Sequence, residues 1–208
     1  MKTLLLDCDQ TLYYNPEFIS AIRERMVLYM MKILGKPVEE MVELRKKYLK
    51  AYGTTLSGLM RHQGIDPYDY MNFVHDVDAK LFLKQDEKLR KMLLSLGVHV
   101  CILSNAPIDH IRKVLDLLGI PDVFERIFSI EDFDFHGKPN RSCFEKVCAE
   151  LDVNPQDCWL VDDDEQNLEG AAQFGMHTCL VGNKEDGSFD LRIDTIHQLE
   201  EHISKIRE

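Results

Sequence analysis

The sequence predicts an α/β protein with a three-layer core, in which helices cover a parallel sheet, and with an all-helical insertion after the first strand. After residue 95, short apolar runs alternate with longer stretches of helical spacing, which is the pattern of α/β proteins. Most of these runs are apolar along their length, as strands covered on both faces are. Residues 16–84 break the rhythm, because they contain helix-like segments and no convincing strand.

Each element of the predicted core follows from these patterns. Strands are expected at residues 3–6, 99–103, 126–130, 158–161 and 177–181. Helices are expected between them at residues 108–118, 144–151 and 168–174. The first of these helices carries one apolar stripe and meets a suitable stop at Gly119; the stripe consists of Ile111, Val114, Leu115 and Leu118.

The insertion divides the chain into two predicted domains. Within it, helices are expected at residues 18–34, 38–51, 55–62 and 68–81, separated by Gly35, Gly53 and Gly64. The core domain then comprises residues 1–14 and 85–208, and the helical domain comprises residues 15–84.

Composition limits the partners and the compartment. The chain has 208 residues, with 25 Lys and Arg against 36 Asp and Glu, so its net charge of −11 disfavours nucleic acid polymers and anionic membranes. No stretch approaches the roughly 20 apolar residues that span a bilayer. The first residues reach the acidic Asp7 and Asp9 before an apolar region of the length that a secretory signal needs, about 7–15 residues, so a cytoplasmic protein is expected. The six scattered cysteines are expected to be buried, reduced thiols, and the oligomeric state stays open.

Polar side chains collect where the predicted strands end. The carboxyl ends of parallel strands lie along one edge of an open sheet, where ligands bind. Four separate segments are therefore expected to meet there, and they contribute Asp7 and Asp9, Ser104 and Asn105, Lys138, and Asp162, Asp163 and Asp164.

These carboxylates predict a metal site. Asp7 and Asp9 are two residues apart, so an extended backbone points both to the same side. With Asp162 and Asp163 they crowd at least four carboxylates, which opposes folding unless a cation intervenes. Oxygen ligands favour a hard divalent ion, and Mg²⁺ takes one or two carboxylates together with a substrate phosphate. We therefore expect Mg²⁺ as the cofactor.

The same groups can carry phosphoryl transfer. Asp7, at the tip of the strand, is the expected nucleophile that forms an aspartyl-phosphate, which water then hydrolyses. Asp9 is the expected acid and base, protonating the leaving oxygen and later taking a proton from water. Lys138, Ser104 and the N–H groups that open the helix at residue 108 are expected to hold the phosphoryl charge.

With these residues the sequence resembles the haloacid dehalogenase-like hydrolase superfamily, whose four motifs match DCDQT (residues 7–11), ILSN (102–105), GKP (137–139) and VDDDEQN (161–167). The resemblance implies a Rossmann-like core and a helical cap. It makes Asp7 the nucleophile and Asp9 the acid and base. It places Mg²⁺ on the Asp7 side chain, the Asp9 carbonyl and Asp163, with Asp162 acting through water. It assigns Ser104 and Lys138 to the phosphate, and we group Asn105 with them.

More narrowly, residues 7–13, YGTTLSGLM (52–60) and GIDPYDY (64–70) resemble pyrimidine 5'-nucleotidase-like members. This implies a small phosphate ester as substrate, a pyrimidine nucleoside monophosphate such as UMP or CMP, and substrate contacts from Tyr52, Thr54 and Thr55. Two positions depart from the family pattern. Gln10 stands where Asn or Gly is usual, and Asp164 stands where a small residue is common.

Three alternatives stay open. A sugar phosphomutase or a sugar-phosphate phosphatase of the same superfamily shares the phospho-enzyme. A dehalogenase attacks carbon and does not need a second acid, so Asp9 argues against it. A non-catalytic regulatory or binding protein on this scaffold is free to lose the five motif residues that are retained here, namely Asp7, Asp9, Ser104, Lys138 and Asp163.

Overall fold

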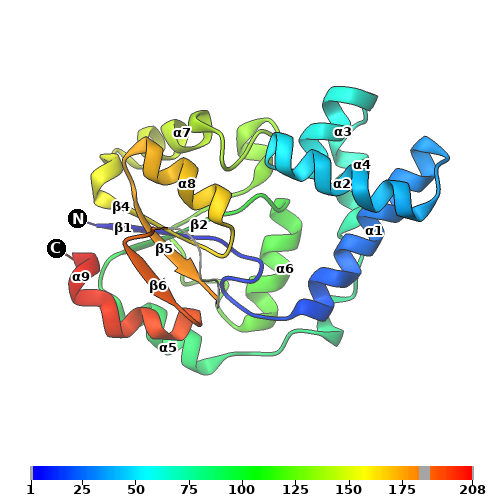
Figure 1. Cartoon of the computed structure of the whole chain (residues 1–208). Coiled ribbons are helices and arrows are strands. Elements are labelled where there is room, and N and C mark those ends of the chain that lie inside the picture. The colour runs from blue at the N-terminus through cyan, green and yellow to red at the C-terminus, as the bar shows by residue number, and fades with distance from the viewer. Residues whose placement is uncertain (1, 183–187, 208) are drawn as a thin grey trace. The chain divides into compact units, whose positions relative to one another are not determined.

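The computed structural model describes residues 2–182 and 188–207, and it confirms the predicted α/β fold. The chain divides into two compact units (Figure 1). The sheet unit comprises Met1–Tyr14 and Leu83–Glu208, and the helical unit comprises Asn15–Phe82.

A parallel sheet of six strands forms the centre of the sheet unit, in the spatial order β3, β2, β1, β4, β5, β6. The strands are β1 (Thr3–Leu6), β2 (His99–Leu103), β3 (Arg126–Phe128), β4 (Cys158–Asp162), β5 (His177–Val181) and β6 (Leu191–Ile193). Leu6 of β1 lies opposite Ile102 of β2 and Val161 of β4. The chain therefore leaves these three strands at the same edge, and β1, between β2 and β4, is the point where the strand order reverses and where ligands bind in open sheets.

Helices cover both faces of this sheet. They are α5 (Glu87–Ser95), α6 (Ile108–Leu118), α7 (Arg141–Leu151), α8 (Glu165–Phe174) and α9 (Ile203–Arg207). Figure 1 shows α7 and α8 on one side of the sheet and α5 and α9 on the other. Coverage on both sides explains why successive residues of β1 are all buried.

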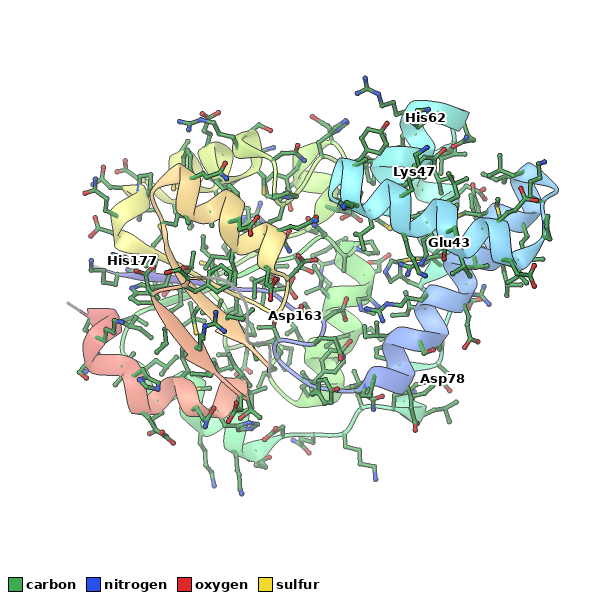
Figure 2. All side chains as sticks on the ribbon, viewed as in Figure 1. Glu43, Lys47, His62, Asp78, Asp163 and His177 are labelled. Atoms are coloured by element: carbon green, nitrogen blue, oxygen red, sulfur yellow. The ribbon has the colours of Figure 1, made fainter. Side chains whose placement is uncertain are left out.

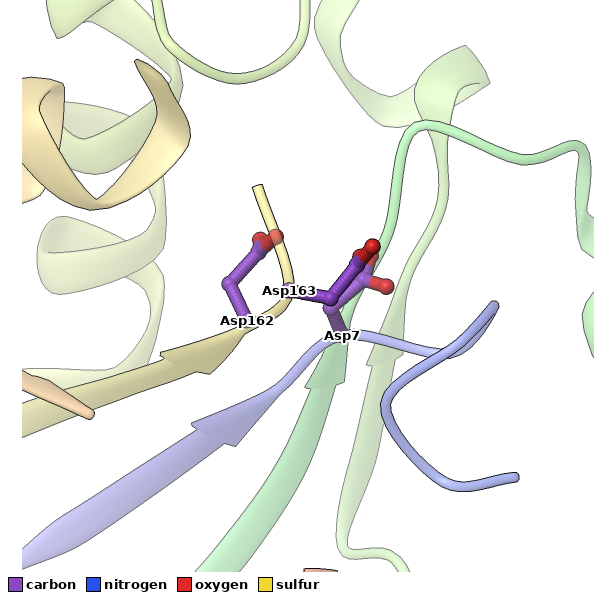
Figure 3. Close-up of side chains that lie close together, drawn as sticks. All are labelled: Asp7, Asp162 and Asp163. Atoms are coloured by element: carbon purple, nitrogen blue, oxygen red, sulfur yellow. The ribbon is translucent and has the colours of Figure 1, made fainter. Parts of the chain in front are cut away.

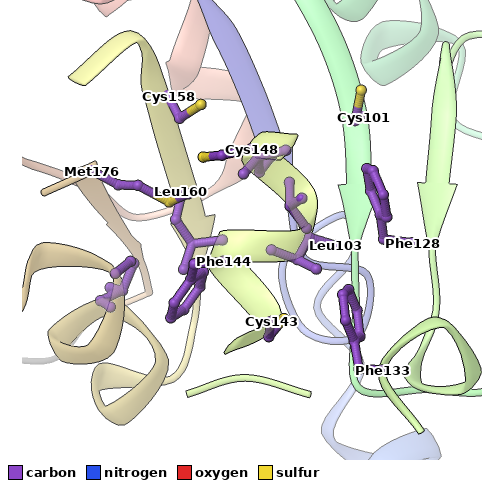
Figure 4. Packing of buried hydrophobic residues seen from close by; sticks show 14 of the residues in the cluster. Cys101, Leu103, Phe128, Phe133, Cys143, Phe144, Cys148, Cys158, Leu160 and Met176 are labelled. Carbon is purple, nitrogen blue, oxygen red and sulfur yellow. The ribbon is translucent and has the colours of Figure 1, made fainter. Parts of the chain in front are cut away.

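The core beneath α7 and α8 is tightly packed. Leu103, Phe128, Phe144 and Leu160 are fully buried there (Figure 4). Burying one such side chain stabilises the fold by about 1.5–3 kcal/mol. The apolar interior therefore stabilises the sheet whose edge carries the polar groups.

The observed helix ends confirm one predicted boundary and show that two helices begin earlier than predicted. The stripe predicted on α6 is buried, and Gly119 ends the helix in a left-handed conformation with φ of 76°. Helix α8 begins at Glu165, three residues before the predicted start, because the side chain of Asp164 caps it by accepting the Gln166 N–H. Helix α7 begins at Arg141, which is also three residues before its predicted start, but no side-chain bond caps it.

In the helical unit, α1 (Pro16–Leu34), α2 (Val38–Tyr52), α3 (Thr55–Gln63) and α4 (Pro67–Val74) follow one another. The prediction of one helix over residues 68–81 was wrong. Helix α4 ends at Val74, and Asp78 caps a separate 3₁₀ turn, Ala79–Leu81, by accepting the Lys80 N–H. An aspartate that bonds to its own backbone in this way competes with helix continuation. Among the described helices, none combines the length and apolarity that a membrane crossing requires.

Two strand predictions also need correction. The strand expected at residues 126–130 ends at Phe128, because Ser129 and Asp132 cap each other and start the 3₁₀ turn Ile130–Phe133. Strand β6 was not predicted, since its three residues at the sheet edge alternate between buried and exposed and are too few to produce a strand signal.

Candidate active site

Three carboxylates from two adjacent strands meet at the carboxyl edge of the sheet. Asp7 follows β1, Asp162 ends β4 and Asp163 comes next (Figure 3). One oxygen from each of the three lies within 4.8 Å of the others. Figure 2 shows that this edge, marked by Asp163, is distinct from the opposite edge, where His177 begins β5. The sheet register thus brings together carboxylates that are 155 residues apart in the sequence.

Lys138 joins this group from a loop between β3 and α7. Its side chain is fully buried, and its Nζ donates to Oδ1 of Asp7 at 2.9 Å and to Oδ2 of Asp162 at 2.5 Å. Burial alone would lower the pKa of the Lys138 ammonium, but the charges of Asp162 and Asp7 outweigh it and raise that pKa well above its ordinary value. Lys138 is therefore a fixed positive charge in the site.

The three carboxylates exceed this single positive charge. Burial raises the pKa of the Asp7 carboxyl well above its ordinary 3.8, and Asp162 and Asp163 raise it further, whereas Lys138 acts in the opposite direction. With all three carboxylates ionised, one ammonium would leave two negative charges, which a divalent cation would neutralise. An all-oxygen donor set of this kind suits Mg²⁺.

Several hydrogen bonds hold the carboxylate of Asp162. Its Oδ1 accepts the Asp164 N–H at 2.8 Å, and the Asn167 side-chain amide donates to both of its oxygens at 3.1–3.2 Å. Asn167 had no predicted role, although it lies in the VDDDEQN segment, in the first turn of α8. Asp164, which departs from the family pattern, uses its carboxylate to cap α8.

Asp9 lies on the turn after β1, and side chains from two places hold its carboxylate. The Tyr13 hydroxyl donates to Oδ1. Nε2 of His110, on α6, lies 2.9 Å from Oδ1 and 3.1 Å from Oδ2. Sequence reasoning missed His110; the available signal was its place in the first turn of the helix after β2, which starts at the same edge.

Ser104 and Asn105 follow β2 and shape the neighbouring loops. The Ser104 side chain is buried, and its hydroxyl accepts the Ala106 N–H at 3.2 Å. The Asn105 amide donates to the Lys138 carbonyl at 2.8 Å, which ties the lysine loop to β2. A Cβ at Gly137 would lie 2.2 Å from Oδ1 of Asn105, so only glycine allows this approach.

The turn between Asp7 and Thr11 has an unusual conformation at Gln10. The φ of Gln10 is 65°, in the left-handed region, which costs a non-glycine residue about 1–2 kcal/mol. The turn closes through the Leu12 N–H, which donates to the Cys8 carbonyl at 3.1 Å. Gln10 therefore adopts a conformation that Asn or Gly accepts more readily.

The three predicted substrate residues lie in the helical unit. The Thr54 hydroxyl caps α3 by accepting the Ser57 N–H at 3.0 Å, and Thr55 is buried. The Tyr52 hydroxyl lies 2.7 Å from Nε2 of His62. Thr54 and Thr55 thus have local structural roles, and Tyr52, like Thr54, is half-buried.

Comparison with known proteins identifies the family. Residues 1–175 match the model of the haloacid dehalogenase-like hydrolases. Phosphate metabolism protein 8 of Saccharomyces cerevisiae is 27% identical over 192 residues, which cover 84% of this chain but 60% of that protein. Glyceraldehyde 3-phosphate phosphatase of Pyrococcus furiosus is 26% identical over 200 residues, covering 86% of this chain and 79% of the relative. The structure of the hydrolase YfnB of Bacillus subtilis bound to magnesium has a TM-score of 0.66, with 17% identity and 98% of both chains covered. The match confirms the family indicated by the four motifs, and the chain therefore belongs to the haloacid dehalogenase-like hydrolases.

Proposed function

We propose that this hydrolase is a Mg²⁺-dependent phosphomonoesterase that acts on small phosphate esters through an aspartyl-phosphate at Asp7. The observation that carries the proposal is the meeting of Asp7, Asp162 and Asp163 around the buried ammonium of Lys138. The carboxylates can bind a divalent cation, and the ammonium can stabilise the negative charge of a phosphoryl group. The phosphatase from Pyrococcus furiosus supports the same reaction class.

The metal would be held by Asp7 and Asp163 directly, by the Asp9 carbonyl, and by Asp162 through water. In support of this division, the oxygens of Asp162 already accept bonds from Lys138, Asp164 and Asn167. Bound Mg²⁺ supplies positive charge that neutralises the phosphoryl oxygens. The magnesium in the YfnB structure is in keeping with this assignment.

Two steps complete the reaction. A carboxylate oxygen of Asp7 attacks phosphorus, the P–O bond to the leaving group breaks, and the Asp9 carboxyl gives its proton to the leaving oxygen. Water then attacks the phosphorus of the aspartyl-phosphate, Asp9 takes a proton from that water, and inorganic phosphate leaves with Asp7 restored. Lys138, 2.9 Å from Asp7, stabilises the charge on the transferring phosphoryl group, together with Ser104 and Asn105.

For the substrate, we propose a pyrimidine nucleoside 5'-monophosphate such as UMP or CMP, with the helical unit acting as a cap that selects it. The YGTT segment at residues 52–55 supports this choice. The guanidinium of Arg61 lies 5.7 Å from the centre of the Tyr52 ring. Aromatic rings accept nucleobases by stacking. Thr54, which caps α3, and the buried Thr55 would complete this substrate segment by holding it in place beside Tyr52.

A sugar-phosphate phosphatase is the second candidate. The glyceraldehyde 3-phosphate phosphatase of Pyrococcus furiosus favours it, because that relative aligns with most of this chain. A sugar phosphomutase shares the phospho-enzyme but returns the phosphoryl group to a sugar, so it must exclude water.

The decisive experiment uses the purified full chain with Mg²⁺. Phosphate release is measured with UMP, CMP, AMP, GMP and several sugar phosphates, beside conversion of glucose 1-phosphate to glucose 6-phosphate. We expect the pyrimidine nucleotides to give the highest kcat/KM, and Asp7→Asn to abolish release while the fold is kept. Tyr52→Phe and Tyr52→Ala then separate the hydroxyl from the ring, with Ala raising KM more.

Each other outcome corrects one part of the proposal. Turnover retained in Asp7→Asn would refute the nucleophile. Faster hydrolysis of a sugar phosphate would replace the substrate class but keep the reaction. Isomerisation without free phosphate would indicate a mutase, and no reaction with any ester would indicate a binding or regulatory protein.

A further inference from the structure

Side chains from two other positions hold the carboxylate of Asp9. Its Oδ1 accepts from the Tyr13 hydroxyl and lies 2.9 Å from Nε2 of His110, and Oδ2 lies 3.1 Å from the same nitrogen. All three residues belong to the sheet unit. The contact pairs the first turn of the chain after β1 with a helix that starts about a hundred residues later.

His110 is a rigid support for this contact. Its side chain is 3% exposed, against 23% for Asp9, so the ring is buried and its polar edge faces the carboxylate. His110 is the third residue of α6, and the Glu131 carboxylate accepts the Ile108 N–H at the start of the same turn, at 3.2 Å. The imidazole is thus fixed both by its packing and by its backbone.

Tyr13 completes the support from the other side. The Tyr13 side chain is buried, and its hydroxyl donates to Oδ1 of Asp9. Two donors of different origin converge on Oδ1, which leaves the carboxylate little freedom to rotate.

Orientation of this carboxylate matters in the reaction proposed above, on which this inference rests. Asp9 has to deliver its proton to the leaving oxygen while the Asp7–phosphorus bond forms. A displacement of about 1 Å at such a group costs about 100-fold in rate. A carboxylate on a turn, with no fixed partners, would spend much of its time in other rotamers.

We propose that His110 is a positioning residue that, together with Tyr13, holds the Asp9 carboxyl in the orientation required for protonating the leaving group. In this assignment His110 does not touch the substrate and acts through the Asp9 carboxylate. The proton moves only between Asp9 and the leaving oxygen, and later between water and Asp9.

A purely structural role for the contact makes a different prediction. If His110 served only to fill the space beside α6, its replacement would change stability and would affect all substrates alike. A positioning role affects the step in which the leaving group takes a proton. Nitrophenolate is stable as an anion and leaves without that proton, whereas an alkoxide needs it.

The test therefore compares 4-nitrophenyl phosphate with the alkyl phosphate that the wild type hydrolyses best. The parameter is kcat/KM, which covers the steps up to loss of the leaving group. The variants are His110→Phe, which keeps a ring but removes the donor, His110→Gln, which restores an N–H, and Tyr13→Phe. The matched control is His99→Phe, because Nδ1 of His99 contacts Glu125 at 2.6 Å at the opposite edge of the sheet. Unfolding in urea is followed for every variant.

We expect His110→Phe to lower kcat/KM about 100-fold for the alkyl ester and only a few-fold for the nitrophenyl ester. His110→Gln should recover most of the loss, Tyr13→Phe should show the same selectivity, and His99→Phe should match the wild type. Tyr13→Phe keeps the test valid if His110→Phe fails to fold. Equal losses on both esters, or no loss on either, would overturn the positioning role alone. A wild type inactive on both esters would overturn the proposed function and this inference with it.

Discussion

The Nζ atom of Lys138 lies 2.5 Å from Oδ2 of Asp162, and both side chains are almost completely buried. Removing two charges from water costs several kcal/mol for each ion unless further bonds compensate. Here Asp162 receives those bonds from Asn167 and the Asp164 N–H, and Lys138 has Asp7 as a second partner. The pair therefore forms the fixed base of the site, and its neighbours make distinct predictions.

Lys138→Met leaves Asp7 and Asp162 buried without a counter-charge. We expect the free energy of unfolding to fall by about 3–5 kcal/mol, as when one partner of a buried ion pair is removed. Urea denaturation measures the change. Lys2→Met is the control, since the partly exposed pair of Lys2 with Asp157 is worth about 1 kcal/mol or less. Equal losses in the two variants would contradict this account.

Asp7→Asn is expected to stabilise the metal-free protein at neutral pH. Because the pKa of Asp7 is raised in the folded state, the folded chain binds more protons than the unfolded chain above pH 3.8. The stability of the wild type therefore falls as pH rises through that raised pKa, and the asparagine variant lacks this fall.

Urea unfolding from about pH 5 to about pH 8, with EDTA, tests this sign. Added Mg²⁺ should restore the wild type and leave Asp7→Asn unchanged, because the amide is a poor ligand for the cation. Parallel pH profiles for the two proteins would show that burial of Asp7 carries no such penalty.

Asp163→Asn and Asp164→Asn separate metal binding from helix capping. Asp163 belongs to the carboxylate cluster, whereas Asp164 caps α8, and asparagine caps as well as aspartate. We expect Asp163→Asn to raise the Mg²⁺ concentration for half-maximal phosphate release by about 10-fold or more, and Asp164→Asn to leave it unchanged. A similar rise in both variants would mean that general negative charge, and not direct ligation, attracts the metal.

Gly137→Ala tests the close contact that positions the lysine loop. The added Cβ would lie 2.2 Å from Oδ1 of Asn105 and 2.8 Å from Cδ1 of Ile130, so the loop has to move. We expect a loss of about 1–3 kcal/mol in stability, together with a lower kcat. Gly64→Ala, which meets nothing within 4 Å, should cost only its left-handed backbone, about 1–2 kcal/mol, with kcat unchanged. An unchanged kcat in Gly137→Ala would show that the close contact of Gly137 with Asn105 does not position the lysine loop for catalysis.

The long apolar runs made most of the fold predictable. Buried strands such as β1 and β5 coincide with short runs that are mostly apolar, because a strand covered on both faces buries nearly all of its side chains. The errors occurred where short side chains bond to their own backbone, as at Ser129 and Asp78, and at the sheet edge, where β6 is short. Such local bonds compete with periodicity, and hydrophobic patterns do not register them.

By itself, the sequence determined the order of the strands along the chain and which acidic and basic residues follow each strand, since these depend on local composition. Only the tertiary structure decided which of those residues share a contact: that Lys138 bridges Asp7 and Asp162, that Asn167 supports Asp162, and that His110 and Tyr13 hold Asp9. The physical reason is that a loop reaches any of several neighbours at the sheet edge. The packing of helices against the sheet, a property of the whole chain, selects one of them.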